Sequence, residues 1–203
     1  MAYFITFIIG YILGSLNLAV LLGKRKGVDV ITGGSANPGA SNTTILLGWW
    51  AGISVGLHDI GKALLATFIA GQLFPNTEGI KAVAGASCVV GHIFSVFLKF
   101  KGGKGFASYI GLMLALNWKF ALIILAAVVF ITVLLDYLTI GTTFTVISLP
   151  VFLAVTAAGW IAITAVCIAT AVIIFKHKEN YIRIVKGTEF GLRSTIKGEH
   201  RVK

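Results

Sequence analysis

The chain has 203 residues, of which 57% are hydrophobic and only 12% charged, and its formal net charge is +10. Ordinary soluble domains are about 45–50% apolar and about 25% charged. A water-soluble globule of this length could not cover so much apolar surface, so the composition excludes a soluble enzyme, a disordered tail and a secreted disulfide scaffold. It favours an integral membrane protein.

Apolar stretches follow one another along almost the whole chain. A helix needs about 20 mostly apolar residues to cross the hydrocarbon core of a bilayer. By this criterion we predict an all-α integral membrane protein with seven transmembrane helices, at residues 2–23, 48–73, 81–97, 106–117, 119–135, 138–156 and 159–175. The stretch 106–117 is short, so we expect it to be tilted or buried against its neighbours. Residues 1–189 form one membrane domain in this prediction, and residues 190–203 form a basic tail.

The basic residues indicate how the helices are oriented. Three segments, 24–26, 99–104 and 176–203, together hold 14 of the 17 Lys and Arg residues. With seven spans, these three segments fall on the same side of the membrane. Lys and Arg concentrate on the cytoplasmic side of membrane proteins. We therefore expect the N-terminus outside and the C-terminus in the cytoplasm, with no need for a nucleic-acid partner to explain the positive charge.

The first polar segment on this side covers residues 33–44 and consists mostly of Gly, Ser, Asn and Thr. Amides freed by glycine, small polar side chains and a helix N-terminus together make a suitable anion site. The candidate ligands are Ser35, Asn37, Ser41 and Asn42. An ordinary connecting loop with an N-cap at Ser41 or Asn42 explains the composition equally well.

The second segment, residues 91–105, ends in the run Lys-Gly-Gly-Lys-Gly. Glycine lets the main chain approach a phosphate closely, and lysine neutralises its charge. A loop that only anchors the cytoplasmic side needs lysines but not these glycines, so we favour anion binding. The candidates are Gly102, Gly103, Lys104 and the intramembrane His92.

The third segment, residues 176–189, follows the last span and contains the candidates Lys176, His177, Asn180, Arg183 and Glu189. His177, Asn180 and Arg183 are spaced to share one face of a helix. The alternative is a polybasic tail that lies on anionic lipid headgroups.

Two further features lie within the predicted spans. Asp59 and Lys62 can pair on one helix face, because a charge inside a bilayer must face protein or water. A structural ion pair and a role at the site remain equally open for them. Thr142 adds a hydroxyl at the cytoplasmic start of the sixth span.

In this order, the three segments resemble those of the bacterial acyl-phosphate:glycerol-3-phosphate acyltransferases. Residues 91–105 carry the most specific match, Gly-His-x-Phe followed by Phe-x-x-Phe-Lys-Gly-Gly-Lys-Gly. The resemblance covers about 10–189 and implies a multi-pass enzyme of the bacterial plasma membrane without cofactor or metal. The implied substrates are acyl phosphate and glycerol 3-phosphate, and the implied products are lysophosphatidic acid and phosphate.

The resemblance also assigns roles to the candidate residues. Lys104, His177 and Asn180 are expected to take part in catalysis. The expected substrate-binding residues are Ser35, Asn37, Ser41, Asn42, Lys62, His92, Gly102, Gly103, Thr142, Lys176, Arg183 and Glu189. The proton of the acceptor hydroxyl would pass to His177 or to the acceptor's own phosphate.

The sequence departs from the family pattern at Ile45, where the family usually has Arg, and at Ala36, where it usually has Gly. The missing cation leaves open a related acyltransferase with a different acceptor. A non-enzymatic lipid-binding or transport protein is a further alternative. However, transporters place polar residues near the bilayer midplane, whereas here they gather at one face.

Overall fold

A computed structural model describes residues 1–189 and 191–196 of the chain. Within these residues the chain is entirely helical, without a strand. The elements are α1 (Ala2–Ser15), α2 (Leu18–Lys26), α3 (Ala40–Leu47), α4 (Trp49–Leu73), α5 (Ile80–Ile93), η1 (Val96–Leu98), α6 (Phe106–Leu116), α7 (Trp118–Leu135), α8 (Leu138–Val155), α9 (Trp160–Lys176), α10 (Lys178–Val185) and α11 (Leu192–Ile196). Of the predicted tail, residues 190 and 197–203 lie outside the described residues.

The predicted all-α membrane class is confirmed, and each of the seven predicted stretches contains a helix. In the described part of the chain, five segments are long and apolar enough to cross a membrane, namely Ala2–Lys26, α4, Ile80–Leu98, α7 and α8. A sixth is the pair α9 and α10, which is bent by 45°. The α6 helix is shorter, at 11 residues, and its inner face is buried, as expected for the short stretch.

Close contacts between small residues pack α1 against the central α5. A Cβ atom at Gly14 would collide with the carbonyl oxygen of Cys88, and one at Gly91 with that of Tyr11. Small residues at such positions let two helix backbones approach closely, which is a common way to pack helices in membranes. The glycine pair Gly10 and Gly14 of α1 therefore serves packing within one chain.

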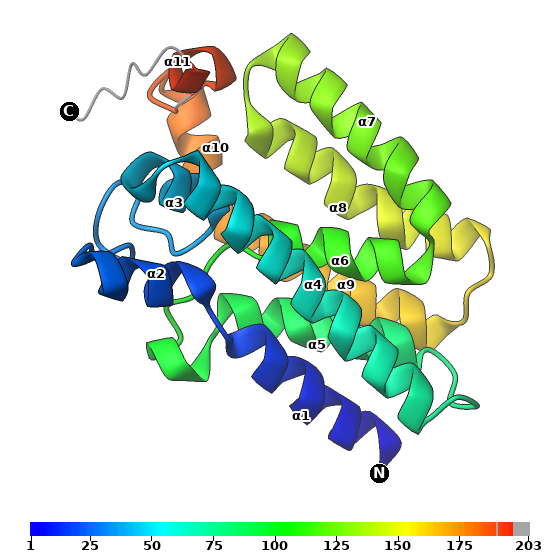
Figure 1. The fold of residues 1–203 in the computed structure, drawn as a ribbon. Coiled ribbons are helices and arrows are strands. Elements are labelled where there is room, and N and C mark those ends of the chain that lie inside the picture. Colours follow the sequence, from blue (N-terminus) through cyan, green and yellow to red (C-terminus); the bar gives the residue numbers. More distant parts are fainter. Residues whose placement is uncertain (190, 197–203) are drawn as a thin grey trace.

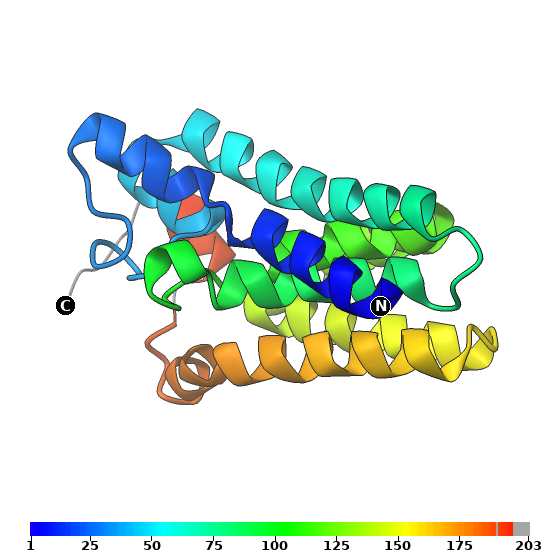
Figure 2. The ribbon, with the colours of Figure 1, turned by 90° about the horizontal axis from the view of Figure 1, so that it is seen from below.

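The helices form a bundle whose two ends differ (Figure 1, Figure 2). In both views α2, α3, the loop before α6 and α10 gather at one end, while the N-terminus and the loops 74–79 and 156–159 lie at the other. The three polar segments thus come together at one end of the bundle.

The first apolar segment is broken between α1 and α2, and this break helps to bring the first polar loop to the polar end of the bundle. Asn17 caps α2 by accepting a hydrogen bond from Val20 N (3.0 Å), and its amide donates to Pro38 O (2.9 Å). Side-chain acceptors at this position satisfy amides that the helix leaves unpaired. Asn17 therefore links the start of α2 to the first polar loop.

Candidate active site

A cavity of about 550 Å³ opens at the polar end of the bundle. Residues of all three polar segments line it. Those predicted from the sequence are Ser35, Asn37, Ser41, His92, Lys104, Thr142, His177, Asn180, Arg183 and Glu189. Five other predicted residues, Asn42, Lys62, Gly102, Gly103 and Lys176, do not line it. Residues far apart in the sequence therefore share one site.

The N-terminus of α6 forms one wall of the cavity. Lys104, Gly105, Phe106 and Ala107 line it, and α6 begins at Phe106. The first amides of a helix have no partner within the helix, and they favour an anion nearby. Lys104 Nζ donates to Asn180 Oδ1 (2.7 Å). Burial and the neighbouring Arg183 guanidinium lower the pKa of Lys104 to about 8.

The α10 helix forms the facing wall with a chain of polar contacts. Asn180 Nδ2 donates to Glu189 Oε1 (2.5 Å), and Arg183 Nε donates to Glu189 Oε2 (2.6 Å). Both carboxylate oxygens of Glu189 are therefore engaged. Together with the contact from Lys104, this chain fixes the geometry of α10 relative to the start of α6.

His177 lies where α9 ends and α10 begins, and it is buried. Its Nδ1 is 2.8 Å from Ile173 O, and a carbonyl can only accept, so Nδ1 carries the proton. Burial and the nearby Lys104 ammonium lower the pKa of His177 to about 4, against the opposing effect of the Ile173 carbonyl. The ring is therefore neutral near pH 7, and Nε2 keeps a lone pair that can accept a proton.

The first polar loop is shaped by Asn42 rather than capped by it. The buried Asn42 side chain accepts from Ser35 N (2.7 Å) and donates to Val30 O and Gly33 O (both 3.0 Å). The helix begins at Ala40 with Gly39 as its N-cap, so the alternative of an N-cap at Ser41 or Asn42 is wrong. Asn42 is a loop-shaping residue, whereas Ser35, Asn37 and Ser41 face the cavity.

The amides of the two glycines before Lys104 are bonded within the chain, and neither glycine lines the cavity. Their amides donate to carbonyls at the end of α5, Gly102 N to Ile93 O (3.0 Å) and Gly103 N to His92 O (3.1 Å). A Cβ atom at Gly102 would collide with His92 O, and one at Gly103 with the His92 ring. The close approach that requires glycine is therefore to His92, and it places Lys104 at the cavity.

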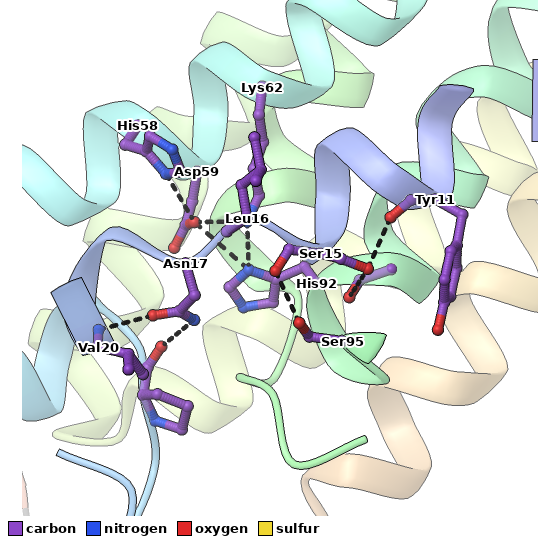
Figure 3. Close-up of polar contacts among 12 residues, drawn as sticks. Tyr11, Ser15, Leu16, Asn17, Val20, His58, Asp59, Lys62, His92 and Ser95 are labelled. Carbon is purple, nitrogen blue, oxygen red and sulfur yellow. Dashed lines mark hydrogen bonds and ion pairs between the residues drawn. The ribbon is translucent and has the colours of Figure 1, made fainter. Parts of the chain in front are cut away.

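A buried ionic cluster lies beside the cavity (Figure 3). Lys62 Nζ contacts Asp59 Oδ1 (2.8 Å), Leu16 O (2.9 Å) and His92 Nδ1 (2.9 Å). An ammonium only donates, so His92 Nδ1 accepts and Nε2 carries the ring proton. The predicted pairing of Asp59 with Lys62 is confirmed. Of these two residues only Asp59 lines the cavity. Lys62 does not line it, but it contacts Asp59 and His92, which do.

The positions of several further residues relative to the cavity could be seen only in the structure. Lys176 Nζ lies 5.8 Å from the centre of the Phe94 ring, and its charge acts on Lys104 although Lys176 does not line the cavity. Thr132 and Thr139 join Thr142 at the cavity, and so does Ile45. The spacing of Thr139 and Thr142, three residues apart at the start of a span, was a signal that could have identified Thr139. Among residues 1–189 and 191–196, no group of three His, Cys, Asp or Glu side chains is arranged to hold a metal ion.

The fold and the cavity define an integral membrane protein with a polar, partly cationic site at one end of its helix bundle. A sequence profile described as "Glycerol-3-phosphate acyltransferase" matches residues 4–187, and the chain belongs to this family.

Individual relatives agree with this assignment. The chain is 37% identical to glycerol-3-phosphate acyltransferase 1 of Oceanobacillus iheyensis, over 96% of this chain and 97% of that protein. It is also 37% identical to the glycerol-3-phosphate acyltransferase of Coxiella burnetii strain CbuG_Q212, over 93% of this chain and 97% of that protein.

Solved structures are similar over nearly the whole fold. The crystal structure of PlsY (YgiH), an integral membrane glycerol 3-phosphate acyltransferase, in its glycerol 3-phosphate form superposes with a TM-score of 0.89 at 30% identity. That match covers 96% of this chain and 98% of PlsY. The lysophosphatidic acid form of PlsY gives a TM-score of 0.85 at 31% identity, covering 94% of this chain and 95% of PlsY.

Proposed function

We propose that the protein transfers an acyl group from an acyl phosphate to the 1-hydroxyl of glycerol 3-phosphate. The bond between the acyl carbon and the phosphate oxygen breaks, an ester forms at the 1-hydroxyl, and lysophosphatidic acid and inorganic phosphate are released. The observation that carries this proposal is the position of Lys104, which lies beside the α6 N-terminus and is bonded to Asn180 of α10 within the cavity. Family membership favours this enzyme over a non-enzymatic lipid-binding or transport protein.

Phosphate binding follows from the charges and donors in the cavity. Lys104, the free amides of the α6 N-terminus and Arg183 supply positive potential. Ser35, Asn37 and Ser41 add neutral donors from the opposite loop. At pH 7 most Lys104 is protonated, because its pKa of about 8 is above that pH, and a bound phosphate favours the charged form further.

The chemical step needs little from the protein because an acyl phosphate is already activated. Positioning of the two substrates and stabilisation of the developing negative charge supply most of the acceleration. His177 can accept the proton of the attacking hydroxyl at Nε2, since Nδ1 is held by Ile173 O. The alternative proton acceptor is the phosphate group of glycerol 3-phosphate itself.

A second, apolar hollow suits the acyl chain. It has a volume of about 620 Å³, and its lining residues are Phe120, Ile140, Thr143, Phe144, Ile147, Ser148, Val151, Phe152 and Val155. The α8 helix contributes to both hollows, because Leu138, Thr139 and Thr142 line the polar cavity. A donor bound across α8 would have its phosphate at the polar end and its chain along the helix.

We further propose that the polar end faces the cytoplasm of a bacterium and that the chain spans the inner membrane seven times. The basic segments 24–26, 99–104 and 176–186 belong to this end of the bundle (Figure 1). In this arrangement the partners of the protein are acyl phosphate and glycerol 3-phosphate as substrates, and the surrounding membrane lipids.

The test is acyl transfer by the purified protein in detergent, supplied with palmitoyl phosphate and glycerol 3-phosphate. For Lys104→Ala we expect kcat/KM to fall about ten- to a hundredfold, because a charge-assisted phosphate contact is lost. Lys101→Ala is the matched control, since this exposed lysine of the same loop does not line the cavity. No transfer from any acyl phosphate, or equal losses in both variants, would contradict the proposal.

A specific observation favours a second candidate, an acyl-phosphate-dependent enzyme with another acceptor. Ile45 lines the cavity at the position where the family usually has Arg. The side chains that line the cavity, as far as the structure describes them, then include two cations, Lys104 and Arg183, and two carboxylates, Asp59 and Glu189. An acceptor with less negative charge than glycerol 3-phosphate would suit this balance.

A further inference from the structure

The two oxygens of the Asp59 carboxylate differ in their surroundings, because Oδ1 pairs with Lys62 whereas Oδ2 has no hydrogen-bond partner among the described residues (Figure 3). Asp59 lies on α4 and is only 2% exposed. Its Oδ1 is 2.8 Å from Lys62 Nζ and 3.4 Å from the Nδ1 atoms of both His58 and His92. No hydrogen bond to Oδ2 is formed from the residues that the structure describes.

This second oxygen is the carboxylate atom that Asp59 can offer to the cavity. Asp59 is one of the residues that line the cavity. Over residues 1–189 and 191–196, the buried side-chain oxygens that are shut off from the surface and unpaired are those of Thr6, Ser108 and Thr132. Asp59 Oδ2 is not among them, so we infer that this oxygen keeps some accessible surface, and the position of Asp59 in the cavity wall makes it a candidate acceptor there.

The cluster holds this oxygen in place. Lys62 has three N–H groups, and they reach Asp59 Oδ1, Leu16 O and His92 Nδ1. None remains for a substrate. The buried lysine therefore compensates the charge of Asp59 and fixes its orientation, and it has no N–H to spare for a phosphate.

The charge of Asp59 limits what it can contact. An anionic oxygen repels the phosphate of either substrate but accepts strongly from a neutral hydroxyl. The other carboxylate at the cavity, Glu189, already accepts from Asn180 and Arg183 with its two oxygens. Asp59 Oδ2 is thus the available anionic acceptor, among the described lining residues, for a hydroxyl group of the acceptor.

We propose that Asp59 Oδ2 accepts a hydrogen bond from the 2-hydroxyl of glycerol 3-phosphate, the hydroxyl that does not react. This contact selects a polyol phosphate over a simple alcohol phosphate. The inference rests on the proposed function, because it assigns a recognition contact for that acceptor. Lys62 is a positioning residue that acts through Asp59, and His92 in turn holds the Lys62 ammonium.

The test compares glycerol 3-phosphate with propane-1,3-diol monophosphate, which keeps the reacting primary hydroxyl and the phosphate but lacks the 2-hydroxyl. With the wild-type protein we expect kcat/KM to be about ten- to a hundredfold higher for glycerol 3-phosphate. In Asp59→Asn this ratio falls to within about threefold of unity, because the anionic acceptor is lost. The ratio does not depend on the fraction of folded protein, since both acceptors are assayed with one preparation.

His58→Ala is the matched control, because His58 also contacts Oδ1 but does not line the cavity, and it should keep the wild-type ratio. If Asp59→Asn does not fold with Lys62 left unpaired, the same ratio is measured in Asp59→Asn/Lys62→Met. An unchanged ratio in the Asp59 variant, or a wild-type ratio near unity, overturns the inference. Absence of transfer to both acceptors by the wild-type protein instead overturns the proposed function.

Discussion

At the scale of single residues, the two histidines of the cavity are held in opposite tautomers. His177 donates from Nδ1 to Ile173 O, so its Nε2 has a lone pair. His92 accepts at Nδ1 from Lys62, so its Nε2 carries a proton. The Nε2 atom of His177 can therefore accept a proton, whereas the Nε2 atom of His92 already carries one. This assignment comes from their partners, one a carbonyl and the other an ammonium.

Ala36 and Ile45 are the two departures from the family pattern for which the structure supplies a physical consequence. Ala36 adopts a left-handed backbone conformation with φ of +51°. This region favours glycine and costs other residues about 1–2 kcal/mol, which explains why glycine is usual there. Ile45 puts an apolar side chain into the cavity.

Restoring the cation at Ile45 tests which acceptor the cavity binds. If the acceptor is glycerol 3-phosphate, we expect Ile45→Arg to lower its KM about ten- to a hundredfold, because a charge-assisted contact to phosphate is added. Ile45→Leu, which preserves an apolar side chain, should leave KM nearly unchanged. The measurement is the initial rate against acceptor concentration at saturating palmitoyl phosphate. An unaltered KM in Ile45→Arg would favour the candidate with a different acceptor.

At the scale of elements, α8 connects the two hollows of the protein. Its first turns line the polar cavity through Thr139 and Thr142, and one face of the helix between Ile140 and Val155 lines the apolar hollow. The stacked rings of Phe120 and Phe152, with centroids 4.1 Å apart, form part of that hollow. From Ile140 to Val155 the helix rises about 22 Å, which is close to the length of a long extended acyl chain.

A bulky residue in the middle of this hollow should shorten the acyl chain that the enzyme accepts. Ser148 lies there, about 12 Å along the helix from Ile140. For Ser148→Phe we expect the rate with palmitoyl phosphate to fall about tenfold or more relative to the rate with decanoyl phosphate, since burial of each lost CH₂ contributes about 0.8 kcal/mol. Ser148→Ala is the control for the lost hydroxyl. A chain-length profile identical to that of the wild type would show that the acyl chain binds elsewhere.

At the scale of the whole molecule, charge and apolar packing are separated. Apolar side chains cover the flanks of the bundle, with residues such as Leu57, Phe68, Phe130 and Trp160 exposed as in a protein that faces lipid. Polar loops and short helices occupy one end (Figure 2). Most of the positive charge therefore lies at the polar end, where the proposed topology and the proposed phosphate site both place it.

The orientation can be checked by labelling single cysteines in a background that lacks the exposed Cys167, as Cys167→Ala. Lys101 and Lys119 are exposed loop or helix-end residues that the proposed topology puts on opposite sides. A membrane-impermeant maleimide should label Lys119→Cys in intact cells and Lys101→Cys only after lysis. The reverse pattern would invert the topology, and labelling of both in intact cells would contradict the separation of the two ends.

The helical stretches, the membrane class and the three segments that line the site were all predictable from the sequence. These features are local, because the apolar length of a segment and the positions of its charges do not depend on what it packs against. The placement of Asn180 and Arg183 on one face of α10 also followed from their spacing, whereas His177 precedes that helix as its N-cap. Even the pairing of Asp59 with Lys62 was predictable, since the two residues are one helical turn apart.

The contacts between distant groups could be known only from the folded structure. Lys104 contacts Asn180 across 76 positions of sequence, and Lys62 contacts His92 across 30. The amides of Gly102 and Gly103 proved to be engaged with the end of α5, and Asp59 proved to line the cavity. These outcomes depend on how closely the helices pack and on which hydrogen-bonding groups each neighbour presents, and such contacts between distant segments leave no periodic signal in the sequence.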